Sequence, residues 1–192
     1  MQGINRDTEA GIFSFIGSAR GSWKVQSMTT VTGRSLEYVS AIDVRAGELN
    51  LIEKSSAAWV ITAALSHARY TTRKEKVELA DSSLQTGNPD FDFAAMIPIK
   101  KSAEWWEMTQ DERRRIFEED SRHIRNGLAY AGIIARRLYH SKDRGEDFDF
   151  VTWFEFTSSH ANAFDTLCEL LRSSEEWKYV LREIDIRLVR DN

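Results

Sequence analysis

The stretch Ala57-Ala58-Trp59-Val60-Ile61-Thr62-Ala63-Ala64-Leu65 is apolar on both faces, and this pattern predicts a central strand of a sheet. Residues 71–84 follow it with charges at helical spacing and predict a helix, in which Val77 and Leu84 lie seven positions apart. The apolar stretch is the longest in the chain, yet it falls far short of the roughly 20 residues that a membrane-spanning helix needs. We therefore expect a soluble protein that combines strands with helices.

Shorter strands are predicted upstream, at residues 13–16 and 23–28, with Gly17, Gly21 and Gly33 as turn positions between and after them. Downstream, residues 85–90 (Gln-Thr-Gly-Asn-Pro-Asp) are rich in turn-forming types and form the best linker candidate in the chain. We place a boundary there and expect two halves, residues 1–88 and residues 89–192.

The second half repeats this mixture of strands and helices. Its predicted elements are a strand at 93–99, a long helical region from Thr109, a strand at 148–156, helices at 161–171 and 175–181, and a strand at 183–189. The helical region starts with a capping box, because the Thr109 hydroxyl can accept from a first-turn amide while Glu112 reaches back. The fold class that follows is α+β, built from two similar units.

The pair Asn126-Gly127 is typical of a helix C-terminus and predicts that the helix ends or kinks there. A second helical stretch is then expected through residues 132–138. This break decides whether His123 and Arg136 can meet, because one continuous helix would separate them by about 20 Å along its axis. If the chain turns back, the two side chains can flank one flat ligand.

Composition excludes several classes of protein. The chain has 192 residues, with 26 Lys and Arg against 30 Asp and Glu, a net charge of −4 and 42% hydrophobic residues. These values are those of an ordinary globular protein rather than a disordered one, and the mild acidity makes nucleic acid an unexpected partner.

The only cysteine, Cys168, precludes an intrachain disulfide and a thiolate cluster. We interpret it as buried packing rather than as a reactive thiol. Residues 1–7 show no basic segment followed by an apolar one, so we expect a cytoplasmic protein, with the periplasm as the alternative if a signal peptide has been removed.

Histidines occur at positions 67, 123, 140 and 160, and none belongs to a spacing that builds a zinc or non-haem iron site. A closed metal cage is therefore not expected. Taken alone, His123 is better explained as a satisfied or surface histidine than as an axial haem ligand.

Several blocks of sequence change that interpretation when they are taken together. In chain order they are Ile97-Pro98-Ile99-Lys100-Lys101-Ser102, Trp105-Trp106-Glu107-Met108-Thr109-Gln110-Asp111-Glu112-Arg113-Arg114, Ile134-Ala135-Arg136, Phe148-Asp149-Phe150-Val151-Thr152-Trp153-Phe154-Glu155-Phe156, Glu175-Glu176-Trp177 and Asp185-Ile186-Arg187-Leu188-Val189-Arg190. These blocks resemble the short, dimeric branch of the chlorite dismutase family over about residues 66–190, with weaker similarity upstream near Trp23 and residues 66–70. Their common order makes the resemblance specific.

The resemblance implies a fold of two ferredoxin-like halves with antiparallel sheets, forming a dimeric alpha-beta barrel-type fold. The N-terminal half, 1–88, would be truncated, and the C-terminal half, 89–192, would bind haem b (iron protoporphyrin IX). The implied activity is that of a chlorite O2-lyase, which converts chlorite to chloride and dioxygen through an oxo-iron species and hypochlorite. A homodimer is implied by analogy with the short branch.

On one face of the haem, the resemblance makes His123 the proximal iron ligand, and neutral imidazole suits that role. Glu176 matches the acid that accepts a hydrogen bond from the other imidazole nitrogen, and Lys101 matches the lysine that supports this acid. On residues alone, Glu176 is as readily a solvated helix acid and Lys101 a surface lysine.

On the other face, Arg136 resembles the distal arginine, whose permanent charge can attract chlorite and hold hypochlorite. The alternative is an exposed helix arginine beside Arg137. Trp105 resembles a haem-flanking tryptophan and is a better candidate than Trp106, with core packing as the alternative. Tyr70 resembles the family's stretch near the haem propionates.

The chain departs from the family pattern at three places. Ala131-Gly132 stands where a Leu-Pro pair is usual, and Ser83 stands where related short members carry a glutamine that restrains the distal arginine, with Gln85 two residues away. Thr62 occupies a position where an arginine is expected. Because proline would fix φ, these changes predict a less restrained Arg136.

Other functions remain open at this point. Coproheme decarboxylases of the same superfamily usually lack the distal arginine and are longer, and dye-decolourising peroxidases carry a distal aspartate. A haem-binding sensor without chlorite activity is the third possibility. Oxygen release from chlorite, loss of propionate carbons, or a haem spectrum with neither would distinguish these functions.

Overall fold

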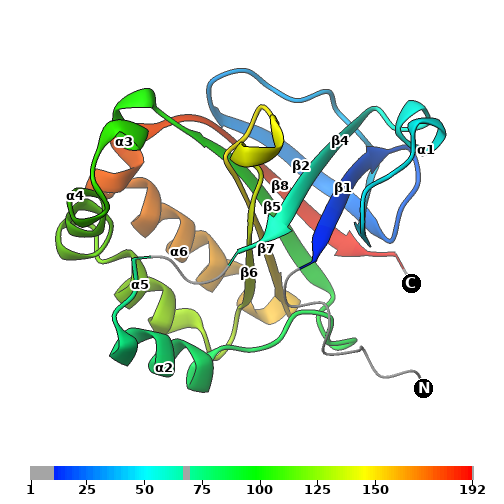
Figure 1. Cartoon of the computed structure of the whole chain (residues 1–192). Coiled ribbons are helices and arrows are strands. Elements are labelled where there is room, and N and C mark those ends of the chain that lie inside the picture. The colour runs from blue at the N-terminus through cyan, green and yellow to red at the C-terminus, as the bar shows by residue number, and fades with distance from the viewer. Residues whose placement is uncertain (1–10, 67–69, 192) are drawn as a thin grey trace.

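The computed structural model describes residues 11–66 and 70–191, and in this part of the chain eight antiparallel strands close into a barrel (Figure 1). The strands are β1 (Ile12–Ser18), β2 (Trp23–Thr32), β3 (Ala41–Ala46), β4 (Trp59–Leu65), β5 (Phe93–Lys101), β6 (Ala135–His140), β7 (Phe150–Phe156) and β8 (Val180–Arg190). The α-helices are α1 (Leu51–Ser55), α2 (Arg73–Ser82), α3 (Ala103–Glu107), α4 (Gln110–Arg114), α5 (His123–Tyr130) and α6 (Ala161–Arg172). Shorter helical turns are the π-helical η2 (Arg115–Asp120) and the 3₁₀ turns η3 (Lys142–Arg144), η4 (Ser158–His160) and η5 (Glu175–Tyr179).

The barrel consists of two groups of four strands, in the order β4-β1-β3-β2 and β8-β5-β7-β6. Counted along the chain, each group has the order fourth, first, third, second. The groups meet along a long β2–β8 seam and along a short β4–β6 seam, where Ala64 faces His140 and Leu65 faces Tyr139. The expected α+β class with antiparallel sheets is confirmed, whereas the boundary between residues 88 and 89 stays a prediction.

Strands β5, β7 and β8 of the second group bury most of both faces, because one face points into the barrel and the other lies under helices. Phe15, Met96 and Ile186 belong to the core inside the barrel. Phe154 on the outer face packs against Phe164 of α6, with ring centroids 4.9 Å apart. Figure 1 shows α2 to α6 on this side of the barrel and α1 at the opposite side. The helical layer and the outer face of β5–β7 therefore enclose a space between them. Within the described residues, the first group of strands is not covered by α2 to α6 and lacks such a space.

The predicted strands at 13–16, 23–28, 93–99 and 148–156 and the helix at 161–171 are all found. Cys168 lies on the buried face of α6, where desolvation raises the pKa of its thiol to about 12, so its interpretation as packing is confirmed. Strand β3 was not predicted, since its sequence, AIDVRA, has only a weak apolar pattern. It forms because hydrogen-bonding partners lie on both sides of it, in β1 and β2.

The expected helix end at Asn126-Gly127 is wrong, because both residues lie inside α5. The chain turns earlier, at Arg122, which adopts the left-handed conformation (φ 54°) after the π-helical turn η2. Gly127 does not have a positive φ, and a Cβ added there would meet nothing within 4 Å. The Asn-Gly pair is thus tolerated by the helix rather than used to end it.

The predicted helix at 132–138 is also wrong, because residues 135–140 form β6 and pair with β7 at every position from Ala135 to His140. Local helix propensity is worth only tenths of a kcal/mol per residue, so a complete hydrogen-bond ladder overrides it. Residues 175–181 likewise form a short 3₁₀ turn followed by the start of β8, instead of a full helix.

Some expectations concern residues that the structure does not describe. Residues 1–7, whose sequence underlies the expected cytoplasmic location, and His67 to Arg69, which contribute to the upstream similarity, lie outside the described residues. Within 11–66 and 70–191, no helix combines the length and the apolar character required to cross a membrane.

Replacing Gly127 by alanine tests the helix assignment. Because Gly127 is in a helix interior with open space around it, Gly127→Ala should raise the free energy of unfolding by about 0.5–1 kcal/mol in a denaturant titration. Gly145→Ala is the matched control, because a Cβ there also meets nothing within 4 Å but φ is +74°, and it should cost about 1–2 kcal/mol. Equal destabilisation by both substitutions would contradict the continuous α5.

Candidate active site in a cavity beside the barrel

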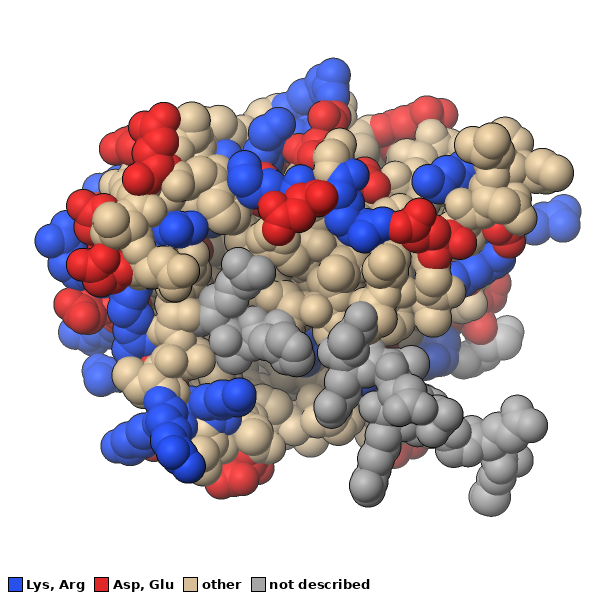
Figure 2. Space-filling view, in the orientation of Figure 1, with Lys and Arg blue, Asp and Glu red and all other residues tan. Residues whose placement is uncertain are grey.

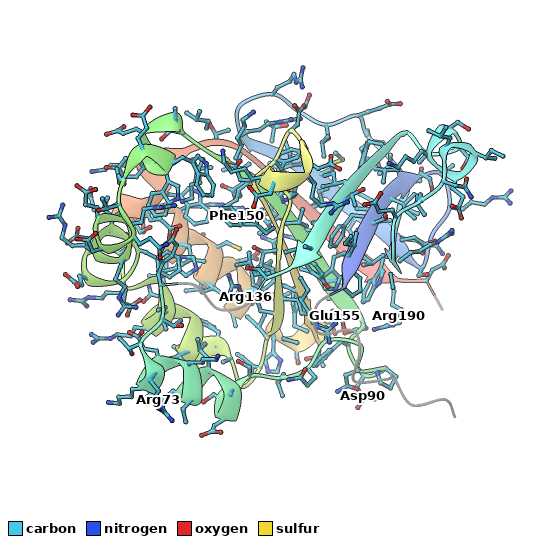
Figure 3. All side chains as sticks on the ribbon, viewed as in Figure 1. Arg73, Asp90, Arg136, Phe150, Glu155 and Arg190 are labelled. Atoms are coloured by element: carbon cyan, nitrogen blue, oxygen red, sulfur yellow. The ribbon has the colours of Figure 1, made fainter. Side chains whose placement is uncertain are left out.

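A cavity of about 520 Å³ lies between the outer face of β5–β7 and the helices α2, α5 and α6. Its size falls in the range of ~300–1,000 Å³ that is usual for ligand pockets. Residues from both halves of the chain line it, including all six site residues expected from the sequence: Tyr70, Lys101, Trp105, His123, Arg136 and Glu176. Figure 3 shows Arg136 near the centre of the molecule, between the strands and the helices.

His123 is the first residue of α5, and its imidazole is held from two sides. Its Nδ1 lies 2.6 Å from Oε2 of Glu176, and its ring stacks on Phe117 with centroids 4.2 Å apart and an interplanar angle of 21°. Among the described residues, Nε2 has no hydrogen-bond partner. A neutral imidazole that donates from Nδ1 to a carboxylate keeps the lone pair on Nε2, which is the arrangement of a metal-ligating histidine.

Glu176 and Lys101 form a buried ion pair beside this imidazole. Each residue is 3% exposed, and Nζ of Lys101 donates to Oε1 of Glu176 at 2.8 Å. Burial alone would raise the pKa of Glu176, but the nearby His123 and Lys101 more than offset it and lower that pKa to about 2. The backbone N–H of Glu176 also donates to Oγ of Ser121 at 2.8 Å. Glu176 is therefore not a solvated acid, nor is Lys101 a surface lysine.

The two tryptophans lie in different surroundings. Trp105 lines the cavity, is 2% exposed and lies under Nζ of Lys101, which is 4.5 Å from its ring centroid. Its buried indole N–H has no hydrogen-bond partner among the described residues. Trp106 packs on Phe150 outside the lining and donates to Oδ2 of Asp149 at 3.0 Å. The structure thus brings only Trp105 to the cavity.

Arg136 extends from β6 into the cavity, where its side chain is accessible yet surrounded by protein. This burial lowers the pKa of Arg136 from its ordinary value, while the charge of Glu176 acts in the opposite direction. Within the described residues, Arg136 has neither a hydrogen bond nor an ion pair. Because guanidinium stays protonated in proteins, the cavity contains a cation that has no fixed counterion at contact distance.

Some of the residues at which the chain departs from the family pattern line the same cavity as Arg136, and one of them lies elsewhere. Ser83, Gln85 and Ala131 all line the cavity, and the backbone N–H of Leu84 donates to the Ala131 carbonyl at 3.1 Å. Thr62 lies elsewhere, buried on β4, with its N–H donating to Oε1 of Glu146 at 2.8 Å. Among the described residues, neither Ser83 nor Gln85 makes a hydrogen bond to Arg136, and the predicted mobility of Arg136 stays a prediction.

Tyr70 forms part of the rim of the cavity. Its backbone is left-handed (φ 59°), its carbonyl accepts from Nη1 of Arg114, and its ring contacts those of Trp105 and Phe117. Arg114 also makes a forked ion pair with Glu75 of α2, at 2.8 and 2.7 Å. Since Leu79 of α2 and Ser83, the residue after this helix, line the cavity, this pair fixes the helix that covers it. Figure 2 shows lysine and arginine side chains gathered over α2.

Sequence reasoning missed the residues that hold the predicted ones in place, namely Ser121, the Glu75–Arg114 pair and the stacking role of Phe117. Phe117 could have been suspected from its spacing to His123 on the same helical region. The others depend on contacts between elements that are distant in the sequence, for example residues 75 and 114.

The Glu75–Arg114 pair predicts a pH-dependent stability. The hydrogen bonds from Arg114 lower the pKa of Glu75 from 4.5 to about 2. The ionised Glu75 therefore stabilises the fold above pH 4.5, and this contribution is lost as the pH falls towards 2. Glu75→Gln should cost about 1–3 kcal/mol at pH 7 in a denaturant titration, with a difference from wild type that shrinks below pH 4.5.

Glu78→Gln on the same helix is the control, because the one ion pair of Glu78 with another described residue is the exposed pair with Lys74 at 3.7 Å. It should change stability by about 0–1 kcal/mol. Equal effects of the two substitutions at pH 7 would show that Arg114 does not hold α2.

Comparison with solved structures relates this geometry to known proteins. A dimeric chlorite dismutase from Nitrobacter winogradskyi superposes with a TM-score of 0.86 and 46% sequence identity, over 93% of this chain and 99% of that chain. A mutant chlorite dismutase from Candidatus Nitrospira defluvii superposes with a TM-score of 0.69 over 97% of this chain and 93% of that chain, but at 18% identity it supports the fold alone.

Sequence comparison points in the same direction. The chlorite dismutase of Ideonella dechloratans is 38% identical over 90 residues, which are 47% of this chain and only 30% of that protein. The chain therefore matches less than a third of the length of this curated relative. The family model for chlorite dismutase matches residues 3–190. Nearly the whole sequence is thus accounted for, and the chain belongs to the chlorite dismutase family.

Proposed function

We propose that this protein is a haem b-dependent chlorite O2-lyase, which converts chlorite to chloride and dioxygen. The observation that carries the proposal is one cavity with two unlike walls. One wall presents His123 with its Nδ1 engaged by a buried Glu176–Lys101 pair, and the other presents the unpaired Arg136. Family membership and the 46% identity to a dimeric chlorite dismutase support the same conclusion.

The residues of the cavity fit a haem. Among the described residues, no cluster of three or more His, Cys, Asp or Glu side chains could hold a metal ion, so an iron bound through His123 would need a macrocycle for its remaining ligands. The cavity walls are largely apolar, which suits a porphyrin. The unpartnered N–H of Trp105 and the hydroxyl of Tyr70, both of which line the cavity, offer donors for propionates. When bound, haem supplies the iron at which the chlorine–oxygen bonds are broken and the oxygen–oxygen bond is made.

Glu176 and Lys101 determine the tautomer and the orientation of the His123 imidazole. Because Lys101 keeps Glu176 ionised, Glu176 accepts a hydrogen bond from the Nδ1–H of His123 and fixes the ring tautomer and orientation. Phe117 limits rotation of the same ring through stacking. The three contacts leave Nε2 as an electron-rich ligand atom, a state that favours binding of ferric iron.

Arg136 acts on the anions. Its charge attracts chlorite into a chain of net charge −4, for which long-range attraction is absent. Inside the cavity, the planar fork of donors can bind a chlorine oxyanion and hold it until both oxygen atoms have left as dioxygen and chloride remains. Since no side chain is paired with Arg136 among the described residues, it is available for this task.

We also propose that each group of four strands is a ferredoxin-like half and that the protein acts as a homodimer. The strand order fourth, first, third, second in both groups supports the first point, with a truncated N-terminal half whose first two strands lack an intervening helix. The dimeric state of the Nitrobacter winogradskyi protein supports the second.

Oxygen evolution from chlorite by the haem-reconstituted protein is the first test. An oxygen electrode should record rapid release from wild type, and Arg136→Ala should slow it by roughly a hundredfold and bleach the haem sooner. Arg136→Lys keeps the charge without the fork and should be intermediate, whereas Arg125→Ala, exposed on α5, should match wild type. No oxygen from fully loaded wild type would refute the activity, and loss of propionate carbons would instead indicate a decarboxylase.

The ligand assignment has a separate test that needs no substrate. His123→Ala should lose stoichiometric, five-coordinate haem binding, as measured by the Soret band and by haem titration. His160→Ala is the control, because that residue contacts Thr157 at 3.0 Å away from the cavity. A Soret band and haem affinity unchanged in His123→Ala would show that His123 is not the ligand.

A further inference from the structure

Helix α5, which begins with His123, lacks the usual cap at its N-terminus. The residue before it, Arg122, is left-handed and provides no side-chain hydrogen bond to the first turn. The first N–H groups of any helix have no partner within the helix, so another group must satisfy them. The orientation of His123 depends on how this first turn is held, because its backbone is part of that turn.

Glu118 supplies the missing cap from the preceding segment. Its Oε2 accepts the backbone N–H of Ile124 at 2.6 Å, and its backbone carbonyl accepts the N–H of Arg122 at 2.9 Å. Glu118 thus holds the chain at both sides of His123. A carboxylate at this point also interacts favourably with the positive end of the helix.

The π-helical turn explains how Glu118 reaches this position. Residues 115–120 form η2, in which the N–H of Ser121 bonds to the Ile116 carbonyl, five residues back, at 3.1 Å. The wider turn brings two consecutive side chains to the start of α5, with Phe117 stacked on the His123 ring and Glu118 bound to the backbone beside it. Single π-helical turns occur often at functional sites, where they redirect side chains.

We propose that Glu118 is a positioning residue for His123, one that sets the direction of the imidazole by fixing the backbone of the first turn of α5. This proposal rests on the proposed function, in which His123 binds the haem iron. Glu176 restrains the ring through one nitrogen, and a ring held at one atom can still swing with its backbone. The Glu118 contact removes that movement, so the side-chain and backbone restraints act together.

The first experiment measures hydrogen exchange of the Ile124 amide in the apoprotein. Glu118→Ala should accelerate this exchange about tenfold, as expected for the loss of one capping bond to a charged group. Glu118→Gln retains an acceptor and should restore most of the protection. Glu119→Ala, which removes the same charge from an exposed neighbouring side chain, should match wild type. Equal exchange in Glu118→Ala and Glu119→Ala would overturn the proposal.

The second experiment measures the iron–imidazole stretching band of the ferrous haem protein by resonance Raman spectroscopy. Glu118→Ala should broaden or shift this band and speed haem transfer to apomyoglobin, with Glu118→Gln and Glu119→Ala near wild type. An unchanged band in Glu118→Ala would refute the positioning role without contradicting the proposed chlorite O2-lyase activity. If wild type itself gives no such band, the haem-ligand assignment fails, and the proposal fails with it, whatever the amide exchange shows.

Discussion

The buried carboxylate of Glu176 imposes the strongest constraint on this structure. An ionised group that is 3% exposed is stable only if charged or hydrogen-bonded partners surround it. The partners of the carboxylate come from two separate elements, Lys101 at the end of β5 and His123 at the start of α5, while Ser121 just before α5 accepts the backbone N–H of Glu176. Satisfying Glu176 therefore requires that the helical layer is docked on the second group of strands, and this docking creates the cavity.

The two walls of the cavity differ in how their charges are satisfied, and this difference suits the proposed chemistry. On the His123 side every charge is paired and rigid, so the imidazole is fixed before any cofactor arrives. On the Arg136 side the guanidinium has no partner in the described part of the chain, although burial among protein atoms lowers its pKa. A cation that stands unpaired inside a cavity can bind an anion there without first breaking an ion pair.

Sequence patterns predicted the elements that periodicity controls. The apolar runs at 13–16, 57–65, 93–99 and 148–156 became strands, and α6 formed where its apolar spacing indicated. The errors fall where non-local contacts decide. Residues 132–138 have reasonable helix propensity, yet they lie in β6 because β7 provides a full ladder. The turn at Arg122 has no local sequence pattern, since Asn126-Gly127 is the stronger helix-ending pair.

By itself the sequence determined the α+β class, the family resemblance and the identity of six cavity residues, because these depend on residue type and order. Only the tertiary structure decided that Glu176 is buried, that Arg136 stands on a strand and that Phe117 and Glu118 flank His123. The physical reason is that burial, pairing and strand register depend on contacts between segments far apart in the chain. Local propensities are too small to specify such contacts.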